Sequence, residues 1–162
     1  MPRVEDHEDL QRDARELQRV LTDLFRVYQF RDRDAICCYD ISTAQSHGLE
    51  RLAVGGPMTL NEFAASLFLE KSSASRLADG LERKGYLKRK ARADDGRYVQ
   101  LELTKRGRML NESIERDLIE ERAQVLADLT PEERAVVIES IARLSGAACA
   151  GVSTEAGCCV RT

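Results

Sequence analysis

The chain has 162 residues, of which 43% are hydrophobic and 33% charged, and its formal net charge is −3. This length and balance predict one globular domain, or one domain with an appended element, and exclude a disordered chain. Aromatic residues make up only 5%, Trp is absent and three Pro occur, which favours helices over a β-sandwich. No apolar run is long enough to cross a membrane, and residues 1–18 are too charged for a secretory signal. We therefore expect a cytoplasmic protein with no membrane partner.

The charge is unevenly distributed along the chain. Residues 71–108 carry 12 Lys and Arg against 5 Asp and Glu, a net charge of +7, whereas the segments on either side are acidic. A basic window in an acidic protein indicates a surface for a polyanion. A solvated charged face is the commoner explanation of a charge run taken alone. The architecture of this window must decide between the two.

The N-terminal segment has the pattern of an amphipathic helix over residues 7–30. Its apolar residues recur at alternating steps of four and three, which places them on one helical face: Leu10, Ala14, Leu17, Leu21, Leu24 and Tyr28. This stripe must pack against a later helix or against a second copy of the chain.

Two capping boxes predict the next two helices. Ser42-Thr43-Ala44-Gln45 opens a helix that stops at Gly55-Gly56-Pro57, and Thr59-Leu60-Asn61-Glu62 opens a short one. A tight connection then leads to a helix over residues 72–84 that is closed by Gly85. Its inward residues are Ala74, Leu77, Ala78 and Leu81, and its outward residues are Ser72, Ser73, Ser75, Arg76, Asp79, Gly80 and Arg83.

Two short strands over residues 86–91 and 98–104 follow, joined by a turn at Asp94-Asp95-Gly96. In the second strand Val99, Leu101 and Leu103 alternate with polar residues, as in a half-buried strand. Helix, turn, helix and hairpin make a winged helix-turn-helix. The predicted fold class is mainly α with a small β-hairpin wing.

The C-terminal part is predicted to be helical again. Apolar periodicity runs over residues 104–129, and Thr130-Pro131 with two acidic residues behind it starts a last helix to about Leu144. From Ser145 onward the sequence is rich in Gly, Ala and Ser and has no periodicity, so we expect a mobile tail.

Residues 55–110 resemble the MarR family of bacterial transcription regulators. The resemblance is carried by five segments in the right order: Gly56-Pro57-Met58-Thr59-Leu60-Asn61-Glu62-Phe63-Ala64, Lys71-Ser72-Ser73-Ala74-Ser75-Arg76-Leu77, Leu81-Glu82-Arg83-Lys84-Gly85-Tyr86-Leu87, Asp94-Asp95-Gly96-Arg97 and Leu101-Glu102-Leu103-Thr104-Lys105-Arg106-Gly107. It implies a homodimeric DNA-binding regulator, and we expect a repressor. Residues 1–36 and 105–146 would be dimerisation helices, 37–104 the winged helix-turn-helix and 147–162 a flexible Cys-containing tail.

The helix over residues 72–84 is the candidate recognition helix. We expect Arg76 to read a guanine with two hydrogen bonds, the serines Ser72, Ser73 and Ser75 to donate to phosphates or base edges, and Lys71 to bind a phosphate. The wing is expected to contribute Lys88, Lys90, Arg92, Asp95 and Arg97. The resemblance implies that Arg97 enters the minor groove, while Asp95 either holds the wing through a salt bridge or is an ordinary turn residue. A two-fold dimer predicts a pseudo-palindromic operator in double-stranded DNA, with half-sites roughly 10 bp apart.

Five cysteines lie outside the DNA-binding window, as the doublets Cys37-Cys38 and Cys158-Cys159 and the single Cys149. In the cytoplasm a disulfide framework is not expected. No cofactor is required, but the four cysteines of the doublets are candidate ligands of a soft metal or metalloid effector, such as arsenic(III), mercury(II), copper(I) or zinc. Two other kinds of effector stay open: oxidation of a Cys pair, or a phenolic molecule in the pocket that the resemblance places between the dimerisation helices and the winged helix. Alternatively, Cys37, Cys38 and Cys149 are small buried hydrophobes and the pair in the tail has no role.

An enzyme, for instance a small thiol enzyme, is the rival class. The sequence has no Cys-x-x-Cys, no phosphate-binding glycine loop and no His-Glu-x-x-His, and neither His7 nor His47 lies beside a nucleophile in sequence. A helical scaffold for protein partners would explain the apolar stripes but not the basic winged segment. We therefore expect a regulator and not an enzyme.

Overall fold

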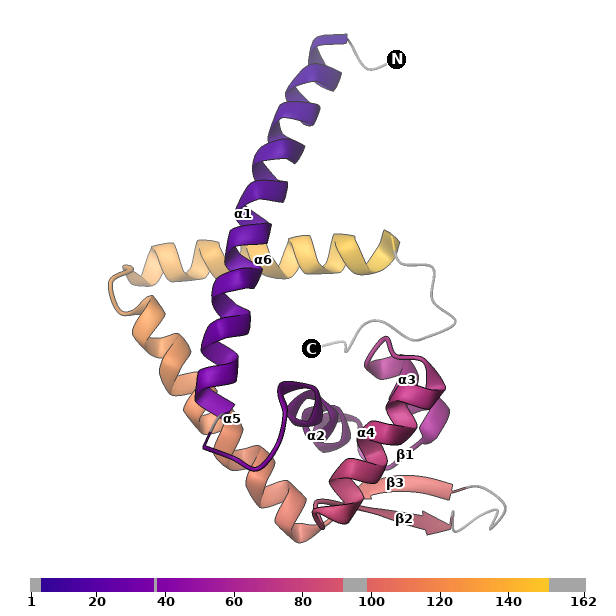
Figure 1. Ribbon diagram of the computed structural model, residues 1–162. Helices are drawn as coiled ribbons and strands as arrows, with labels where there is room; N and C mark the ends of the chain where they lie inside the picture. Colours follow the sequence, from indigo (N-terminus) through magenta and orange to yellow (C-terminus); the bar gives the residue numbers. More distant parts are fainter. Residues whose placement is uncertain (1–3, 37, 92–98, 152–162) are drawn as a thin grey trace.

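The computed structural model describes residues 4–36, 38–91 and 99–151 (Figure 1). Within them the elements follow in the order α1 (Val4–Ile36), α2 (Thr43–Gly55), β1 (Met58–Thr59), α3 (Leu60–Ser66), α4 (Lys71–Arg83), β2 (Leu87–Ala91), β3 (Val99–Leu103), α5 (Lys105–Leu126) and α6 (Pro131–Gly151). Helices α2 to α4 and the strands form one body at the lower right of Figure 1, while α1, α5 and α6 extend away from it as arms. The predicted winged helix flanked by long helices is confirmed.

The winged-helix body is held together by a core to which each of its main elements contributes. Its largest fully buried side chains are Leu49 of α2, Phe63 of α3, Leu81 of α4, Leu87 of β2 and Leu101 of β3. Burying a side chain of this size stabilises the fold by about 1.5–3 kcal/mol. This core fixes α4 against both α2 and the sheet, so the candidate recognition helix has one orientation within the body.

Both predicted capping boxes are present. The Ser42 hydroxyl accepts from the Gln45 amide and the Gln45 side chain accepts from the Ser42 amide, each at 3.2 Å. Thr59 and Glu62 exchange the corresponding bonds at the start of α3. Thr130 and Glu133 do the same before α6, so the predicted Thr cap is also part of a capping box.

The sheet has one strand more than the predicted hairpin. β1 pairs with β3 in antiparallel fashion, with Met58 opposite Leu101, and the strand order is β1-β3-β2. A two-residue strand is too short to show alternation, so the sequence pattern could not indicate it. Leu101 and Leu103 are buried as predicted, but Val99 on the same face is 49% exposed, because β3 extends past the core toward the wing tip.

Several helices differ in length from the prediction. α1 is longer at both ends, and α4 begins at Lys71, one residue earlier than expected. α6 continues to Gly151 where an end near Leu144 was predicted, so residues 145–151 are helical and not part of a mobile tail. Ala147 and Ala148 favour helix and no Pro interrupts the segment, which outweighs the missing periodicity. No helix in the described part of the chain combines the length and the hydropathy that a membrane span requires.

Candidate nucleic-acid interface

Helix α4 separates a buried face from a polar one. Ala74, Ala78 and Leu81 are completely buried against the core, and their spacing of four and three residues turns the opposite face outward. The candidate DNA-contacting residues lie at the start of the helix: Lys71, Ser72 and Arg76 are exposed, and Ser73 and Ser75 are half-buried. The guanidinium of Arg76 is 3.4 Å from the Ser73 hydroxyl, which orients it along the polar face.

Gly80 was predicted on the outward face of this helix, and that prediction is wrong. Gly80 is buried because α2 approaches α4 closely at this position. A Cβ atom added here would lie only 2.6 Å from the side-chain nitrogen of Gln45. The glycine therefore permits the contact between α2 and α4, and it is not part of a surface for DNA.

The strands of the wing carry the second group of cations. Lys88 and Lys90 are both exposed on β2. Lys88 lies opposite Glu102 of β3, and its ammonium is 3.3 Å from that carboxylate. Lys90 lies opposite Gln100 and has no carboxylate partner among the described residues. The remaining wing candidates, Arg92, Asp95 and Arg97, lie outside the described residues.

Arg89 joins the wing to the candidate recognition helix. Its guanidinium donates to Asp79 at 2.6 Å and also to Glu82, both on α4. The hydrogen bond to Asp79 and the charge of Glu82 hold the pKa of Arg89 above its ordinary value. Arg89 is not among the candidate residues from the sequence, and this role was missed. The available signal was the spacing of Asp79 and Glu82, which puts two carboxylates on one side of the helix that the strand must face.

The loop between α1 and α2 contains Cys38 of the first cysteine doublet, which is exposed. The neighbouring Tyr39 hydroxyl donates to Asp117 of α5 at 2.6 Å, and this hydrogen bond raises the pKa of Tyr39. Cys37, Cys158 and Cys159 lie outside the described residues, and Cys149 is half-buried in α6. Over residues 4–36, 38–91 and 99–151 no group of three or more His, Cys, Asp or Glu side chains is arranged to hold a metal ion.

A pocket of about 440 Å³ lies where α1, α2 and α5 meet. Its walls combine apolar side chains, among them Ile36, Ala53 and Ile114, with charged ones. Asp32 of α1 and Arg122 of α5 form an ion pair of 2.8 Å at this site. The full set of lining residues is Asp32, Ile36, Ser46, His47, Glu50, Ala53, Val54, Asn111, Ile114, Glu115, Leu118, Ile119 and Arg122.

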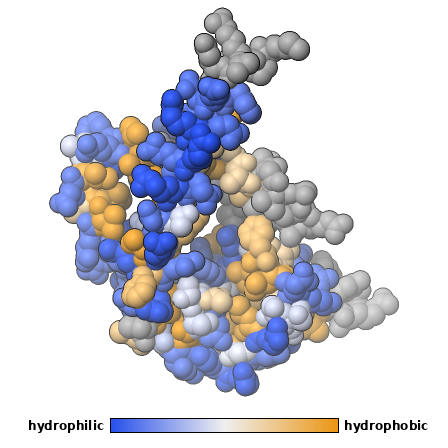
Figure 2. All heavy atoms as spheres, turned by 45° about the horizontal axis from the view of Figure 1, so that its top comes forward, coloured by the Kyte–Doolittle hydropathy of each residue, from blue (hydrophilic) through white to orange (hydrophobic). Residues whose placement is uncertain are grey.

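The arm helices expose much of their apolar surface. Leu17 and Leu24 of the predicted stripe on α1 are 40% and 37% exposed, and on α6 both Val136 and Ile138 are more than half exposed. Figure 2 shows hydrophobic side chains on the surface at the left, where α5 and α6 meet, while the N-terminal end of α1 is mainly hydrophilic. α6 has no extensive packing contact with another described element.

Comparison with known proteins agrees with this architecture. Residues 39–97 match the sequence profile of the MarR family. No curated protein matches the chain in sequence.

Solved structures share the fold over most of the chain. A MarR family protein from Bacillus stearothermophilus is 24% identical, with a TM-score of 0.80 over 85% of this chain and 96% of that one. FabT from Streptococcus pneumoniae, solved in complex with DNA, is 23% identical with a TM-score of 0.73, covering 83% and 96% of the two chains. MepR, a regulator of the Staphylococcus aureus multidrug efflux pump MepA, is 21% identical with a TM-score of 0.67, covering 80% and 96%.

The profile match covers the part of the chain that contains the capping boxes of α2 and α3, helix α4 and the first strand of the wing. The fold extends the likeness to the arm helices, which the profile does not reach. Together they show that residues 39–97 match the MarR family of transcription regulators and that the described chain has the fold of MarR family proteins.

Proposed function

We propose that the protein is a homodimeric repressor that binds a pseudo-palindromic operator and is released from it by an effector. The observation that carries the proposal is the polar face of α4, which presents Lys71, Ser72 and Arg76 beside the basic strand β2. A helix with a buried inner face and a small polar outer face fits the major groove. Such a protein acts in the compartment that holds its DNA, the cytoplasm.

Within this proposal the residues of α4 have distinct roles. Arg76 reads a guanine through two hydrogen bonds, and Ser72, Ser73 and Ser75 donate to phosphates or base edges. Lys71 binds a phosphate where the open amides of the helix start also favour an anion.

In the wing, Lys90 and Arg92 bind phosphates, Arg97 enters the minor groove and Asp95 orients it. Lys88 contributes less than its charge suggests, because it already pairs with Glu102.

Dimerisation is supported by the uncovered apolar surface of the arms. In a monomer, large apolar side chains of the arms contact water, which is unfavourable. Examples are Phe25 and Phe30 of α1 and Ile138 and Ile141 of α6. A second copy of the chain would bury this apolar surface against its own, because a two-fold dimer brings the same surface of both subunits together. It also places two α4 helices on one duplex.

For the effector we propose a thiol-reactive soft metal or metalloid bound by Cys37 and Cys38 together with Cys158 and Cys159. Support comes from the position of Cys38 on the loop that connects the arm to the winged helix, beside Tyr39 and its bond to Asp117. A metal or metalloid that binds several thiolates there would change the conformation of the loop between the arm helix and the winged helix. Oxidation of the same cysteines acts at the same place.

The pocket between α1, α2 and α5 supports a second kind of effector, a small amphipathic molecule. Of its lining residues Asp32, Glu50 and Glu115 are acidic, against the single guanidinium of Arg122, which Asp32 already neutralises. This balance favours a neutral or cationic molecule and disfavours a phenolate anion.

The function is tested by binding of purified protein to the DNA upstream of its own gene. We expect salt-dependent binding to a palindrome there, a dimer by light scattering, and weaker binding to a scrambled duplex of equal length. A monomer, or equal affinity for both duplexes, contradicts the proposal.

The effector is tested by adding arsenite, mercury(II), zinc and peroxide to the operator complex. The wild-type protein is expected to be released from the operator, and the Cys37→Ser, Cys38→Ser double variant is expected to stay bound. A truncation after Gly157, which removes Cys158 and Cys159, is expected to stay bound as well. If release by every agent survives the loss of both doublets, the thiol proposal is wrong.

A further inference from the structure

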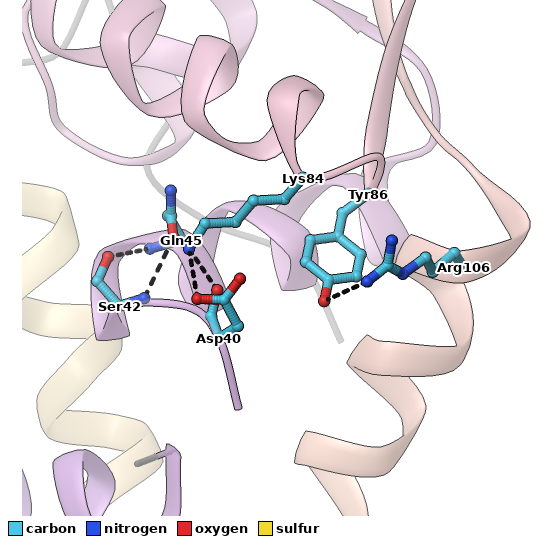
Figure 3. Close-up of polar contacts among 6 residues, drawn as sticks. All are labelled: Asp40, Ser42, Gln45, Lys84, Tyr86 and Arg106. Carbon is cyan, nitrogen blue, oxygen red and sulfur yellow. Dashed lines mark hydrogen bonds and ion pairs between the residues drawn. The ribbon is translucent and has the colours of Figure 1, made fainter. Parts of the chain in front are cut away.

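Lys84, the residue that directly follows α4, reaches back across the molecule to the loop before α2. Its ammonium donates to the backbone carbonyl of Asp40 and to the side-chain oxygen of Gln45, the latter at 3.3 Å. The carboxylate of Asp40 lies 3.5 Å away. Figure 3 shows the Lys84 side chain extended toward both residues.

Gln45 is a fixed acceptor and not a mobile surface amide. Its oxygen also accepts from the Ser42 amide in the capping box of α2. Its nitrogen lies against the backbone of Gly80 on α4, where a side chain would collide with it. The Gln45 amide that receives Lys84 is thus bonded through its oxygen and packed through its nitrogen, which lowers the entropy lost when the lysine binds.

Asp40 belongs to a different part of the molecule, the segment of residues 38–42 that leads from α1 into α2. The residue before it, Tyr39, is bonded to Asp117 on the arm helix α5. The core already fixes α4 to α2, so the bond from Lys84 to Asp40 adds a link between the winged-helix body and the loop, and through Tyr39 to the arm.

We infer that Lys84 is a positioning residue that sets the angle between the winged helix and the arm helices. In the proposed dimer, on which this inference rests, that angle determines the separation of the two α4 helices and hence the half-site spacing that the protein accepts. Charge-assisted bonds from one ammonium to the loop and to α2 make the angle well defined. Lys84 itself contacts no base in this role.

The test compares affinities for operators whose half-sites are at the natural spacing or one base pair further apart. The ratio of the two dissociation constants is the readout, because both duplexes offer the same phosphates and the loss of a charge affects them alike. Wild type is expected to discriminate by about tenfold or more, and Lys84→Met by roughly threefold or less. Lys84→Arg keeps a donor for the carbonyl and should retain the wild-type ratio.

Lys105→Met is the matched control, since it removes the same charge from the exposed start of α5 and should leave the ratio unchanged. A second variant, Asp40→Lys, sets like charges opposite each other at a residue whose side chain is 84% exposed, so it tests the link without disturbing the core. Both Lys84→Met and Asp40→Lys should lose discrimination. If folded Lys84→Met discriminates as the wild type does, Lys84 has no positioning role. If the wild type itself accepts every spacing equally, both this inference and the proposed palindromic binding are wrong, whereas wild-type discrimination that survives in the variants overturns this inference alone.

Discussion

Arg89 on β2 and Asp79 on α4 form an ion pair of 2.6 Å across the gap between the wing and the candidate recognition helix. The pair has two consequences for an interface with DNA. It fixes the strand relative to the helix, and it neutralises a carboxylate that would otherwise stand beside the phosphates. With Glu82 as the second acceptor, the positive charge of Arg89 is directed at the protein and not at the nucleic acid.

Replacing Arg89 with Met is expected to weaken operator binding by about tenfold, because Asp79 and Glu82 are then left to repel the phosphates. The double variant Arg89→Met with Asp79→Asn should recover part of the loss. Fluorescence anisotropy with a labelled operator at one fixed salt concentration measures both. A direct contact from Arg89 to DNA predicts the opposite, since the double variant would then bind no better than the single one.

Arg76 and Lys71 should differ in the kind of binding they support. Arg76→Ala is expected to lower affinity for the operator by about 1–3 kcal/mol and to reduce the ratio of specific to non-specific binding. Lys71→Ala should weaken binding to operator and scrambled DNA by the same factor, because a phosphate contact carries no sequence information. Titration of both duplexes with each variant measures the two ratios. An unchanged ratio in Arg76→Ala would show that this residue does not read a base.

Features coded within a few residues could be predicted from the sequence. The capping boxes at Ser42 and Thr59 each need two polar residues three positions apart, and both partners are visible in the sequence. The alternation of Leu101 and Leu103 with polar residues likewise predicted which face of β3 is buried.

Features that depend on how distant elements meet could not be predicted. The pairing of Arg89 with Asp79 follows from the register of β2 against α4, and the burial of Gly80 follows from the approach of α2. Helical periodicity places Gly80 outward, and only the approach of the Gln45 side chain from α2 shows why this position has no side chain. The link from Lys84 to Asp40 spans 44 positions and has no local signal.

The junction between the sheet and α5 should be the most sensitive site for adding a single methyl group. At Gly107 a Cβ would lie 2.0 Å from the backbone oxygen of Tyr86, which cannot move because the Thr104 amide donates to it at 3.1 Å. Gly107→Ala should lower the free energy of unfolding by about 3 kcal/mol, as in other overpacked sites. Urea unfolding measures this, with the exposed neighbour Arg108→Ala as a control expected to stay within about 0.5 kcal/mol of wild type. Equal stability of Gly107→Ala and wild type would contradict the close contact.

The bond between Tyr39 and Asp117 should make stability depend on pH in the alkaline range. The carboxylate accepts from the neutral phenol and raises its pKa above the ordinary value of 10.0, so the folded state holds this proton more tightly than the unfolded state. The stabilisation is therefore fully present below pH 10 and is lost as the pH rises through the raised pKa of the folded state. The difference in unfolding free energy between wild type and Tyr39→Phe isolates it, because the other titrating groups are shared by both proteins. That difference should be constant from neutral pH to about pH 10 and shrink above it. Asp117→Asn removes the charge of the acceptor and should reduce the same dependence of stability on alkaline pH. If the difference between wild type and Tyr39→Phe is the same at pH 7 and pH 11, the hydrogen bond contributes nothing to the pH dependence of stability.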